Sequence, residues 1–158
     1  MHIRRAVIGD AAALVELENA TFAADRMCAR QWRHHLKSAS AQVYVATRRL
    51  RVVGAAVVFF RRSSRVARLY SIAVAVCERG SGIGEKLLRA VERAARRRGS
   101  RVLRLEVRND NIGAQRLYER HGYRHLGMHR AYYEDGHDAR RYEKVLLPDM
   151  NGGRLEKA

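Results

Sequence analysis

A glycine-rich segment, Arg79–Gly84, joins a predicted strand to the longest predicted helix of the chain, and this junction constrains the fold more than any other feature. The strand runs into it through Tyr70–Val74, and from Ile83 apolar side chains recur at helical spacing until Gly99 supplies a stop. Val102–Val107 then shows the alternation of a second strand. Two strands joined through a helix pair in parallel when they share a sheet, so the chain cannot be all-helical and the sheet cannot be purely antiparallel.

Further predicted elements lie on both sides of this unit. The predicted strands are His2–Val7, Val43–Ala46, Arg51–Phe60, Arg65–Val76, Val102–Val107 and two within Tyr123–Leu147 that flank a turn at Asp135-Gly136. The predicted helices are one after Asp10 with apolar positions from Ala13 to Ala20, then Gln31–Lys37, the long helix from Ile83, and Ala114–His121. This order predicts an α/β (α+β) fold with a mixed, mostly antiparallel central sheet of about seven strands flanked by about four helices.

Composition indicates a folded protein without a membrane segment. The chain has 158 residues, of which 47% are hydrophobic, and this excludes disordered and low-complexity classes. We expect one domain over residues 1–148 and a flexible C-terminal tail over residues 149–158. The longest uncharged apolar run, Val52–Phe60, is too short to span a bilayer, and acidic residues interrupt the N-terminal stretch, so we expect a cytoplasmic protein. The two cysteines show no CxxC pattern and predict neither a disulfide framework nor a zinc site.

Net charge is the extreme property of the composition. The chain carries 32 basic and 16 acidic residues, which gives a formal net charge of +16. A field of this sign attracts phosphates and acidic surfaces, so nucleic acid is a partner to consider. The arginines are spread along the whole chain instead of gathering in a tail. We therefore expect that nucleic acid is not the substrate.

The glycine-rich segment also has the composition of an anion site. Glycines let backbone N–H groups converge at a helix N-terminus, where unpaired donors and the helix dipole favour a phosphate. A Walker A loop would end in Gly-Lys-Ser/Thr where this chain has Gly84-Glu85-Lys86, and the dinucleotide pattern counted from Gly80 ends on Glu85 instead of a glycine. Taken alone, the segment is also compatible with a plain glycine turn.

Taken with its neighbours, the segment resembles a known cofactor loop. Arg79, Gly82 and Gly84 match the Arg-x-x-Gly-x-Gly pattern of the coenzyme A pyrophosphate loop in the GNAT superfamily of N-acetyltransferases, whose order of elements the chain shares. Further matches to that superfamily are Leu105–Arg108, Asn111–Ala114 and Leu117–Tyr123. Within it, the chain most resembles the ribosomal-protein alanine N-acetyltransferases, which act on protein N-termini, and Tyr132–Ala139 fits that subgroup. The resemblance covers residues 2–147 and implies the GNAT fold.

The resemblance implies acetyl-CoA as the cosubstrate and no metal. It assigns the pantetheine arm to main-chain groups of Ile72, Ala73 and Val74, and the pyrophosphate to Arg79, Gly80, Ser81, Gly82, Ile83, Gly84 and Glu85. It gives Asn111 a further bond to pantetheine, for which capping of the next helix is the simpler alternative. Simple alternation along the strand predicts that Tyr70 shares a face with Ile72, opposite the small Ala73. The segment Ala75–Glu78 lacks the Asp-Pro turn common in relatives, which leaves the shape of the loop entry open.

Acetyl transfer to an amine needs a base for the ammonium and a proton for the leaving thiolate, and two residues are candidates. The resemblance makes Glu106 the base, whereas a surface ion pair with Arg104 or Arg108 is the alternative. It makes the phenol of Tyr118 the proton donor, whereas a core aromatic on an amphipathic helix is the alternative. Cys77 as a covalent acetyl carrier is disfavoured, because the sequence places no histidine or carboxylate to activate it.

These assignments predict an acetyl-CoA-dependent N-acetyltransferase in which the amine attacks directly in a ternary complex. The expected acceptor is a protein or peptide N-terminal α-amine, ribosome-associated proteins included. The alternatives are a small-molecule amine acetyltransferase and a non-catalytic basic binding module with the same fold. We expect a monomer or a homodimer and no membrane partner. The segments expected to line the acceptor site, Ala24–Lys37 and Tyr132–Asp138, carry no motif of their own, so the acceptor stays open.

Overall fold

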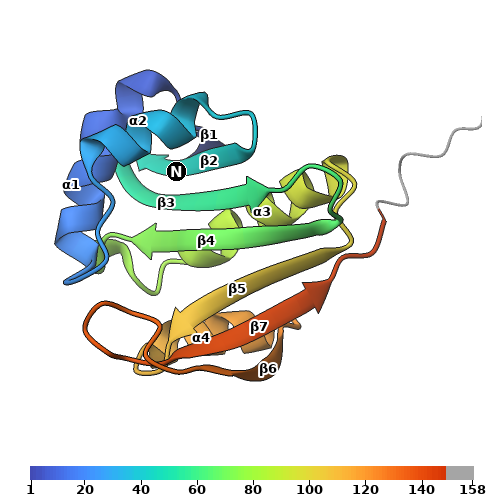
Figure 1. Ribbon diagram of the computed structural model, residues 1–158. Helices are drawn as coiled ribbons and strands as arrows, with labels where there is room; N and C mark the ends of the chain where they lie inside the picture. The colour runs from blue at the N-terminus through green and yellow to red at the C-terminus, as the bar shows by residue number, and fades with distance from the viewer. Residues whose placement is uncertain (149–158) are drawn as a thin grey trace, which may run out of the picture.

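The computed structural model describes residues 1–148 and contains a seven-stranded sheet with the order β1-β2-β3-β4-β5-β7-β6 (Figure 1). The strands are β1 (His2–Arg5), β2 (Ala41–Arg48), β3 (Arg51–Phe60), β4 (Val66–Val74), β5 (Val102–Arg108), β6 (Arg124–His129) and β7 (Ala139–Val145). The helices are α1 (Ala11–Thr21), α2 (Ala29–Lys37), α3 (Ile83–Arg97) and α4 (Ile112–Arg120), with short 3-10 turns η1 (Ile8–Asp10) and η2 (Val76–Glu78). Neighbouring strands are antiparallel except β4 and β5, which are parallel. The predicted fold class and its parallel pair are confirmed.

The predicted division into one domain over residues 1–148 and a tail stays a prediction. The tail itself, residues 149–158, lies outside the described residues. None of the helices in residues 1–148 combines the length and the apolar character needed to span a membrane.

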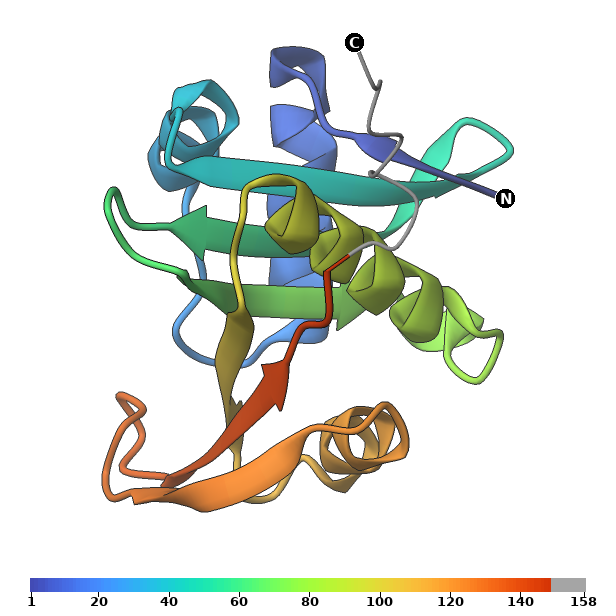
Figure 2. The same cartoon turned by 90° about the vertical axis from the view of Figure 1, so that its right-hand side faces the viewer.

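Helices cover both faces of the sheet and divide the core in two. Figure 2 shows α3 lying across one face, with α1 behind the sheet. Under α3 and α4 the core contains Leu87 and Leu105, and under α1 and α2 it contains Leu14, Trp32 and Val57. The helical spacing of α3 correctly predicted its buried face, which is made of Ile83, Leu87, Leu88, Val91, Ala94 and Ala95.

A β-bulge in β4 changes which residues share a face. Leu69 and Ser71 pair with consecutive residues of β3, so Tyr70 is an extra residue between them. Leu69 belongs to the core under α3, whereas Ala73 belongs to the core under α1 and α2. Tyr70 packs on Phe59 at 4.7 Å between ring centroids and so lies on the α1/α2 side. The predicted alternation was wrong for Tyr70, because the extra residue puts it on the same side as Ala73.

The β6–β7 connection is longer than the predicted turn. β6 ends at His129 and β7 begins at Ala139, and the residues between them form a loop. The predicted turn lies within this loop, where the Gly136 N–H donates to the Tyr133 carbonyl at 2.9 Å. Asp138 closes the loop by accepting the Ala131 N–H at 2.8 Å. This side-chain contact replaces strand pairing, so the strands stop short of the turn.

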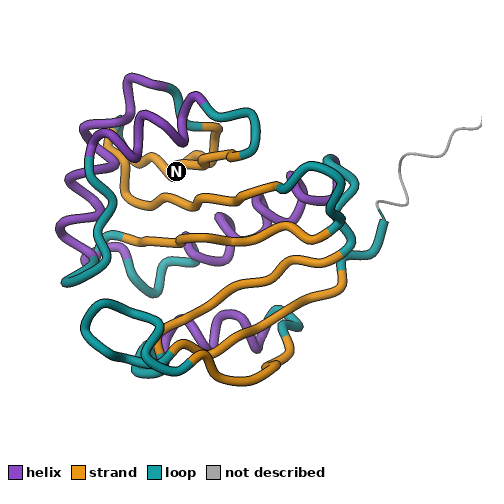
Figure 3. The backbone as a smooth tube through the Cα atoms, viewed as in Figure 1, coloured by secondary structure: helices purple, strands orange, loops and turns teal. Residues whose placement is uncertain are grey.

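β4 and β5 pair over only part of their length. Their register runs from Val66 opposite Val102 to Leu69 opposite Leu105 and ends there, although both strands continue. Figure 3 shows the two strands diverging toward their C-terminal ends. The divergence begins at the bulge residue Tyr70, so the bulge and the loss of pairing mark the same point of the fold.

Candidate active site

The diverging end of β4 has backbone groups that face no strand. The Ala75 N–H donates to the Val53 carbonyl of β3 at 2.8 Å. Because backbone groups alternate in direction along a strand, those of Ile72 and Val74 point away from β3, and those of Ala73 point toward it. β5 does not pair with this part of β4. An extended ligand could therefore bond to Ile72 and Val74 as an added strand would.

The glycine segment begins one turn of η2 after β4. Gly80 and Gly82 have φ values of 79° and 82°, in the left-handed region that favours glycine. A Cβ atom on either residue would meet nothing within 4 Å, so the segment is open on that side. The Ser81 hydroxyl donates to the Glu78 carbonyl, which ties the segment back to η2. The loop entry, whose shape the sequence left open, is thus the 3-10 turn Val76–Glu78.

The N-terminus of α3 offers unpaired donors to this opening. The first intrahelical bond runs from the Lys86 N–H to the Gly82 carbonyl at 3.1 Å, so the N–H groups of the first three helical residues have no helix partner. The Glu85 carboxylate is drawn to Arg89 at 2.7 Å, one turn further along the helix. Backbone donors together with the helix dipole favour an anion at this point.

Gly54 sets how closely β3 approaches the start of α3. A Cβ atom there would lie 2.9 Å from Ile83 Cγ2, 3.0 Å from Leu87 Cδ1 and 3.1 Å from the Ala73 carbonyl oxygen. A larger residue would push the helix, and the glycine segment with it, away from the sheet. The sequence analysis missed Gly54, although a lone glycine inside an apolar strand is a signal of close approach.

Glu106 lies on β5 just past the end of the β4–β5 pairing. Its side chain is 14% exposed, and its carboxylate lies 3.1 Å from Arg68 Nη2 and 3.9 Å from Arg141 Nε. The expected alternative partners are engaged elsewhere: Arg104 pairs with Glu143, and Arg108 pairs with aspartates. Those partners were therefore wrong, because the residues that reach Glu106 come from the flanking strands instead of from β5 itself.

Arg68 links three elements at this point, and the sequence analysis missed it. Its Nη2 contacts both the Glu106 carboxylate and the hydroxyl of Tyr132 in the β6–β7 loop. Its guanidinium carbon lies 5.8 Å from the ring centroid of Tyr70. Its Nε is buried without a hydrogen-bond partner among residues 1–148. The available signal was a charged residue inside a run of apolar strand positions.

Tyr118 lies in the core on the α3/α4 face of the sheet. Its ring is 4% exposed, belongs to the core under α3 and α4, and packs edge-on against Tyr123 at 5.6 Å. Burial raises the pKa of the phenol, which stays protonated at neutral pH. Glu106 lies on the opposite face of β5 from Leu105, which shares the Tyr118 core. The two candidate catalytic groups therefore lie on opposite faces of the sheet.

Tyr133 lies within electrostatic reach of both candidate groups. Burial is the main cause of its raised pKa, and Tyr132 and Glu106 add to it while Arg108 opposes it. Tyr133 in turn adds to the raised pKa of Tyr118, after the larger effect of burial. The sequence analysis placed Tyr133 only among the segments lining the acceptor site.

Asn111 caps α4, as the simpler alternative predicted. Its Oδ1 accepts the Ala114 N–H at 3.1 Å. Gln115, missed from the sequence, donates through Nε2 to the carbonyls of Arg108 and Asn109 at 3.0 Å each. These bonds fix the turn between β5 and α4. A bond from Asn111 to pantetheine stays a prediction.

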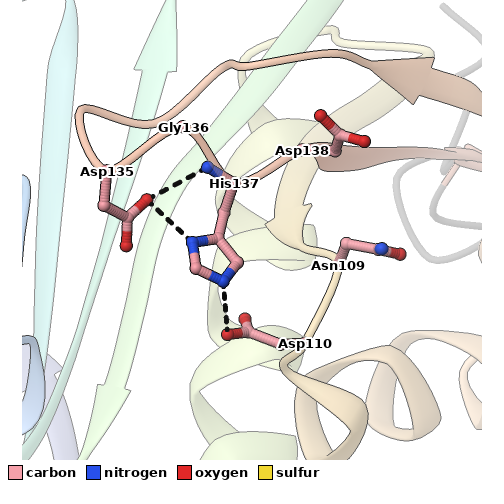
Figure 4. A pocket seen from close by; sticks show the side chains of 6 residues that line it. All are labelled: Asn109, Asp110, Asp135, Gly136, His137 and Asp138. Atoms are coloured by element: carbon pink, nitrogen blue, oxygen red, sulfur yellow. Dashed lines mark hydrogen bonds and ion pairs between the residues drawn. The ribbon is translucent and has the colours of Figure 1, made fainter.

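Two aspartates beside the site, Asp110 and Asp135, are paired with side chains of the same cluster. Figure 4 shows His137 between two carboxylates, with Nδ1 3.1 Å from Asp135 and Nε2 3.4 Å from Asp110. Asp135 also pairs with Arg108 at 2.6 Å, and this guanidinium holds the pKa of the Asp135 carboxyl well below its usual range. The cluster borders a cavity of about 350 Å³. Within residues 1–148, no group of three or more His, Cys, Asp or Glu side chains could hold a metal ion.

The two segments expected to line the acceptor site meet on the face that carries Glu106. Asp25, between α1 and α2, accepts the Glu134 N–H of the β6–β7 loop at 3.4 Å. Glu18 of α1 is 3% exposed, accepts the Met27 N–H at 3.0 Å, and has a pKa raised by burial. This hydrogen bond fixes the segment between α1 and α2, which also contains Asp25.

Comparison with known proteins identifies relatives of this fold and site. A model of the acetyltransferase (GNAT) family matches residues 11–123. N-alpha-acetyltransferase RimI of Mycobacterium tuberculosis is 40% identical over 72 residues, which are 45% of this chain and 44% of that protein. A Bacillus subtilis protein, provisionally named a ribosomal protein bS18-alanine N-acetyltransferase, is 38% identical over 74 residues, 46% of this chain and 49% of that protein. The chain thus spans about half the length of the curated relatives it matches.

A solved structure extends the likeness over the whole fold. The ribosomal-protein-alanine N-acetyltransferase from Brucella melitensis superposes with a TM-score of 0.80 and 26% sequence identity, over 92% of this chain and all of that one (100%). The region matched by the family model reaches from α1 to Tyr123, and so includes β4, the glycine segment, α3, β5 and α4. The protein belongs to the acetyltransferase (GNAT) family.

Proposed function

We propose that the protein is an acetyl-CoA-dependent N-acetyltransferase whose acceptor is the α-amine of a protein N-terminus. The observation that carries the proposal is the opening between β4 and β5. Around it lie an open strand edge, a helix N-terminus with free donors, a carboxylate and a protonated phenol. Each is a group that amine acetylation requires.

The residues present fit acetyl-CoA. The N–H groups at the start of α3, beside Gly80 and Gly82, suit the pyrophosphate, since no side chain fills the space above them. Ile72 and Val74 offer donors and acceptors in the spacing of a strand edge, which suits the amides of pantetheine. Acetyl-CoA supplies the acetyl group as a thioester, which an amine attacks without a further cofactor.

Glu106 and Tyr118 would move the two protons of the transfer. Glu106 accepts the proton of the acceptor ammonium, so that the neutral nitrogen forms a bond to the acyl carbon. The carbon–sulfur bond then breaks, and Tyr118 donates its proton to the departing thiolate. The nitrogen loses its second proton as the amide forms, and that proton restores the phenol. An α-amine has a pKa of about 8, so a carboxylate acting directly or through a water is a sufficient base. Arg68 and Arg141 hold that carboxylate in place.

A protein N-terminus is favoured over a polyamine for two reasons. Two of the relatives, from Bacillus subtilis and Brucella melitensis, bear the name of ribosomal-protein alanine N-acetyltransferases, the first provisionally. The net charge of +16 repels polycations such as spermidine, and Arg108 pairs with Asp110 and Asp135 beside the site. The proposal places the peptide between α2 and the β6–β7 loop.

The test compares kcat/KM for short peptides with free Ala or Ser N-termini against kcat/KM for spermidine, at low and moderate salt. We expect the peptides to be the better substrates. The same peptides with a blocked N-terminus and an added lysine are the control, and should be inactive if the α-amine is the acceptor. Faster, salt-insensitive turnover of spermidine would assign the protein to small-molecule acetylation. Binding of acetyl-CoA without turnover of any amine would leave only a binding module.

A further inference from the structure

A second concave surface lies at the opposite end of α3 from the glycine segment. It forms where the β3–β4 turn meets the C-terminal end of α3 and the residues after β7, and its volume is about 560 Å³. α3 has 15 residues, so the two ends of the helix are about 22 Å apart. This pocket is therefore separate from the candidate active site.

Four arginines line this pocket, and none of its lining residues within residues 1–148 is acidic: Arg65, Arg96, Arg98 and Arg101. Arg65 and Arg101 are adjacent, because the Arg101 N–H donates to the Arg65 carbonyl at 2.7 Å, and both residues are exposed. Both side chains line the same pocket, so an anion bound there would face two positive charges from neighbouring backbone positions.

The other two arginines are held in place by carbonyl groups. Arg96 Nε donates to the Leu147 carbonyl at 3.0 Å, and both Nη atoms of Arg98 donate to the Ala39 carbonyl at 3.2 Å. Carbonyl partners orient a guanidinium without cancelling its charge. Among residues 1–148, the carboxylate that pairs with a lining arginine is that of Glu92, 3.9 Å from Arg96, and it also contacts Lys144 at 3.1 Å. The pocket is thus preorganised and positively charged.

The lining favours phosphate groups over an acidic protein. Arginine presents a planar fork of donors that matches phosphate oxygens, and Ser63 and Ser64 add hydroxyl groups. The apolar lining consists of Leu146 and Pro148, which is less than the apolar centre of a protein interface needs. Surfaces that contact nucleic acid backbones are polar and positively charged in this way.

The extent of the charge favours a polymer over a single phosphate. Arg61 and Arg62 are exposed on the adjoining β3–β4 turn and continue the positive surface beyond the pocket. The nearby aromatic ring of Phe60 is covered by Arg98 at 4.3 Å, so it offers no face on which an unpaired base could stack. We propose that the pocket binds the phosphate backbone of a double-stranded nucleic acid, independently of its sequence and apart from the acetylation site.

The test measures the Kd of labelled RNA and DNA duplexes of equal length by fluorescence polarisation across a salt series, and a difference between their Kd values assigns the source of the phosphate backbone. The variant is Arg65→Gln/Arg101→Gln. These substitutions remove two charges and keep the backbone hydrogen bond between the two residues. We expect at least a tenfold weaker Kd near 0.1 M salt, and a log–log salt slope reduced by about 2. The control is Arg116→Gln/Arg120→Gln on α4, which removes the same charge from exposed positions outside the pocket.

Equal weakening in the two double variants would overturn the proposal, because binding would then reflect net charge alone. Poly-glutamate serves as a competitor. If it binds as tightly as the duplex and loses affinity in the same variant, the partner is an acidic protein and the proposal is wrong. Thermal unfolding of both variants shows whether either has lost its fold, and Arg65→Lys/Arg101→Lys should recover most of the affinity if charge at this place is what matters. None of these measurements depends on acetyl transfer.

Discussion

The two ends of the β4–β5 strand pair use the same strands in opposite ways. At the N-terminal end, Val66–Leu69 and Val102–Leu105 pair in register. Their facing backbone groups bond each other, so only side chains are available there to bind a ligand. At the C-terminal end the pairing stops, and the backbone of Ile72 and Val74 is left facing the opening. Arginines gather at the closed end, and the candidate base Glu106 lies at the open one. The bulge at Tyr70 separates the two.

The largest expected effect is a fall in kcat when the carboxylate at the open end of the strand pair is removed. Glu106→Gln should lower kcat for acetyl transfer on the order of 10²-fold or more, because it keeps the volume of the side chain and removes the proton acceptor. The matched control is Glu143→Gln on β7, which breaks the ion pair with Arg104 at 3.0 Å on the same face of the sheet. Steady-state kinetics should show a change of less than about threefold for the control. Equal losses would remove Glu106 as the base.

The second effect compares the two ends of α3. Acetyl-CoA at 100 times its Kd should raise the free energy of unfolding by about 2.7 kcal/mol. Gly82→Val should abolish most of that increase, because a β-branched residue at a φ of 82° distorts the segment. Gly99→Val, at a φ of 81° past the other end of α3, should destabilise the fold and keep the acetyl-CoA increase. Thermal unfolding with and without acetyl-CoA measures the stabilisation in each variant. If acetyl-CoA stabilises Gly82→Val as much as it stabilises the wild type, the loop is not the pyrophosphate site.

The third effect concerns the phenol. Tyr118→Phe should lower kcat by about 10- to 100-fold and leave the Kd of acetyl-CoA unchanged. Tyr123→Phe is the control, since it removes a hydroxyl that donates to Glu92 at 2.9 Å, and should cost about 1 kcal/mol of stability with little change in kcat. Burial disfavours the phenolate of Tyr118 and raises its pKa, so the wild-type rate should not fall near pH 10 through this group. A fall there that is absent in Tyr118→Phe would contradict the assignment.

The smallest effect tests the packing that positions the open end. Gly54→Ala should lower the free energy of unfolding by about 1 to 2 kcal/mol, because its Cβ would crowd Ile83, Leu87 and the Ala73 carbonyl. Gly113→Ala on α4 meets nothing within 4 Å and should be neutral or stabilising by up to about 1 kcal/mol. Chemical denaturation measures both. Similar values for the two variants would mean that α3 moves freely against β3.

The sequence alone predicted the features that depend on local pattern. The spacing of Leu87, Leu88 and Val91 gave the buried face of α3, and the strand–helix–strand order gave the parallel pair. The positive φ angles of Gly80 and Gly82 agree with the predicted glycine turn. These features follow from periodicity and from backbone conformations that only glycine adopts easily, so neighbouring residues suffice to specify them.

Only the tertiary structure decided what depends on register across strands. The bulge at Tyr70 reversed the face of that side chain and ended the pairing with β5, and no local pattern marks it. The partners of Glu106 come from β4 and β7, because register sets Arg141 opposite it and brings Arg68 beside it. A one-residue shift in pairing moves every following side chain to the other face, so residues far apart in the chain fix the site together.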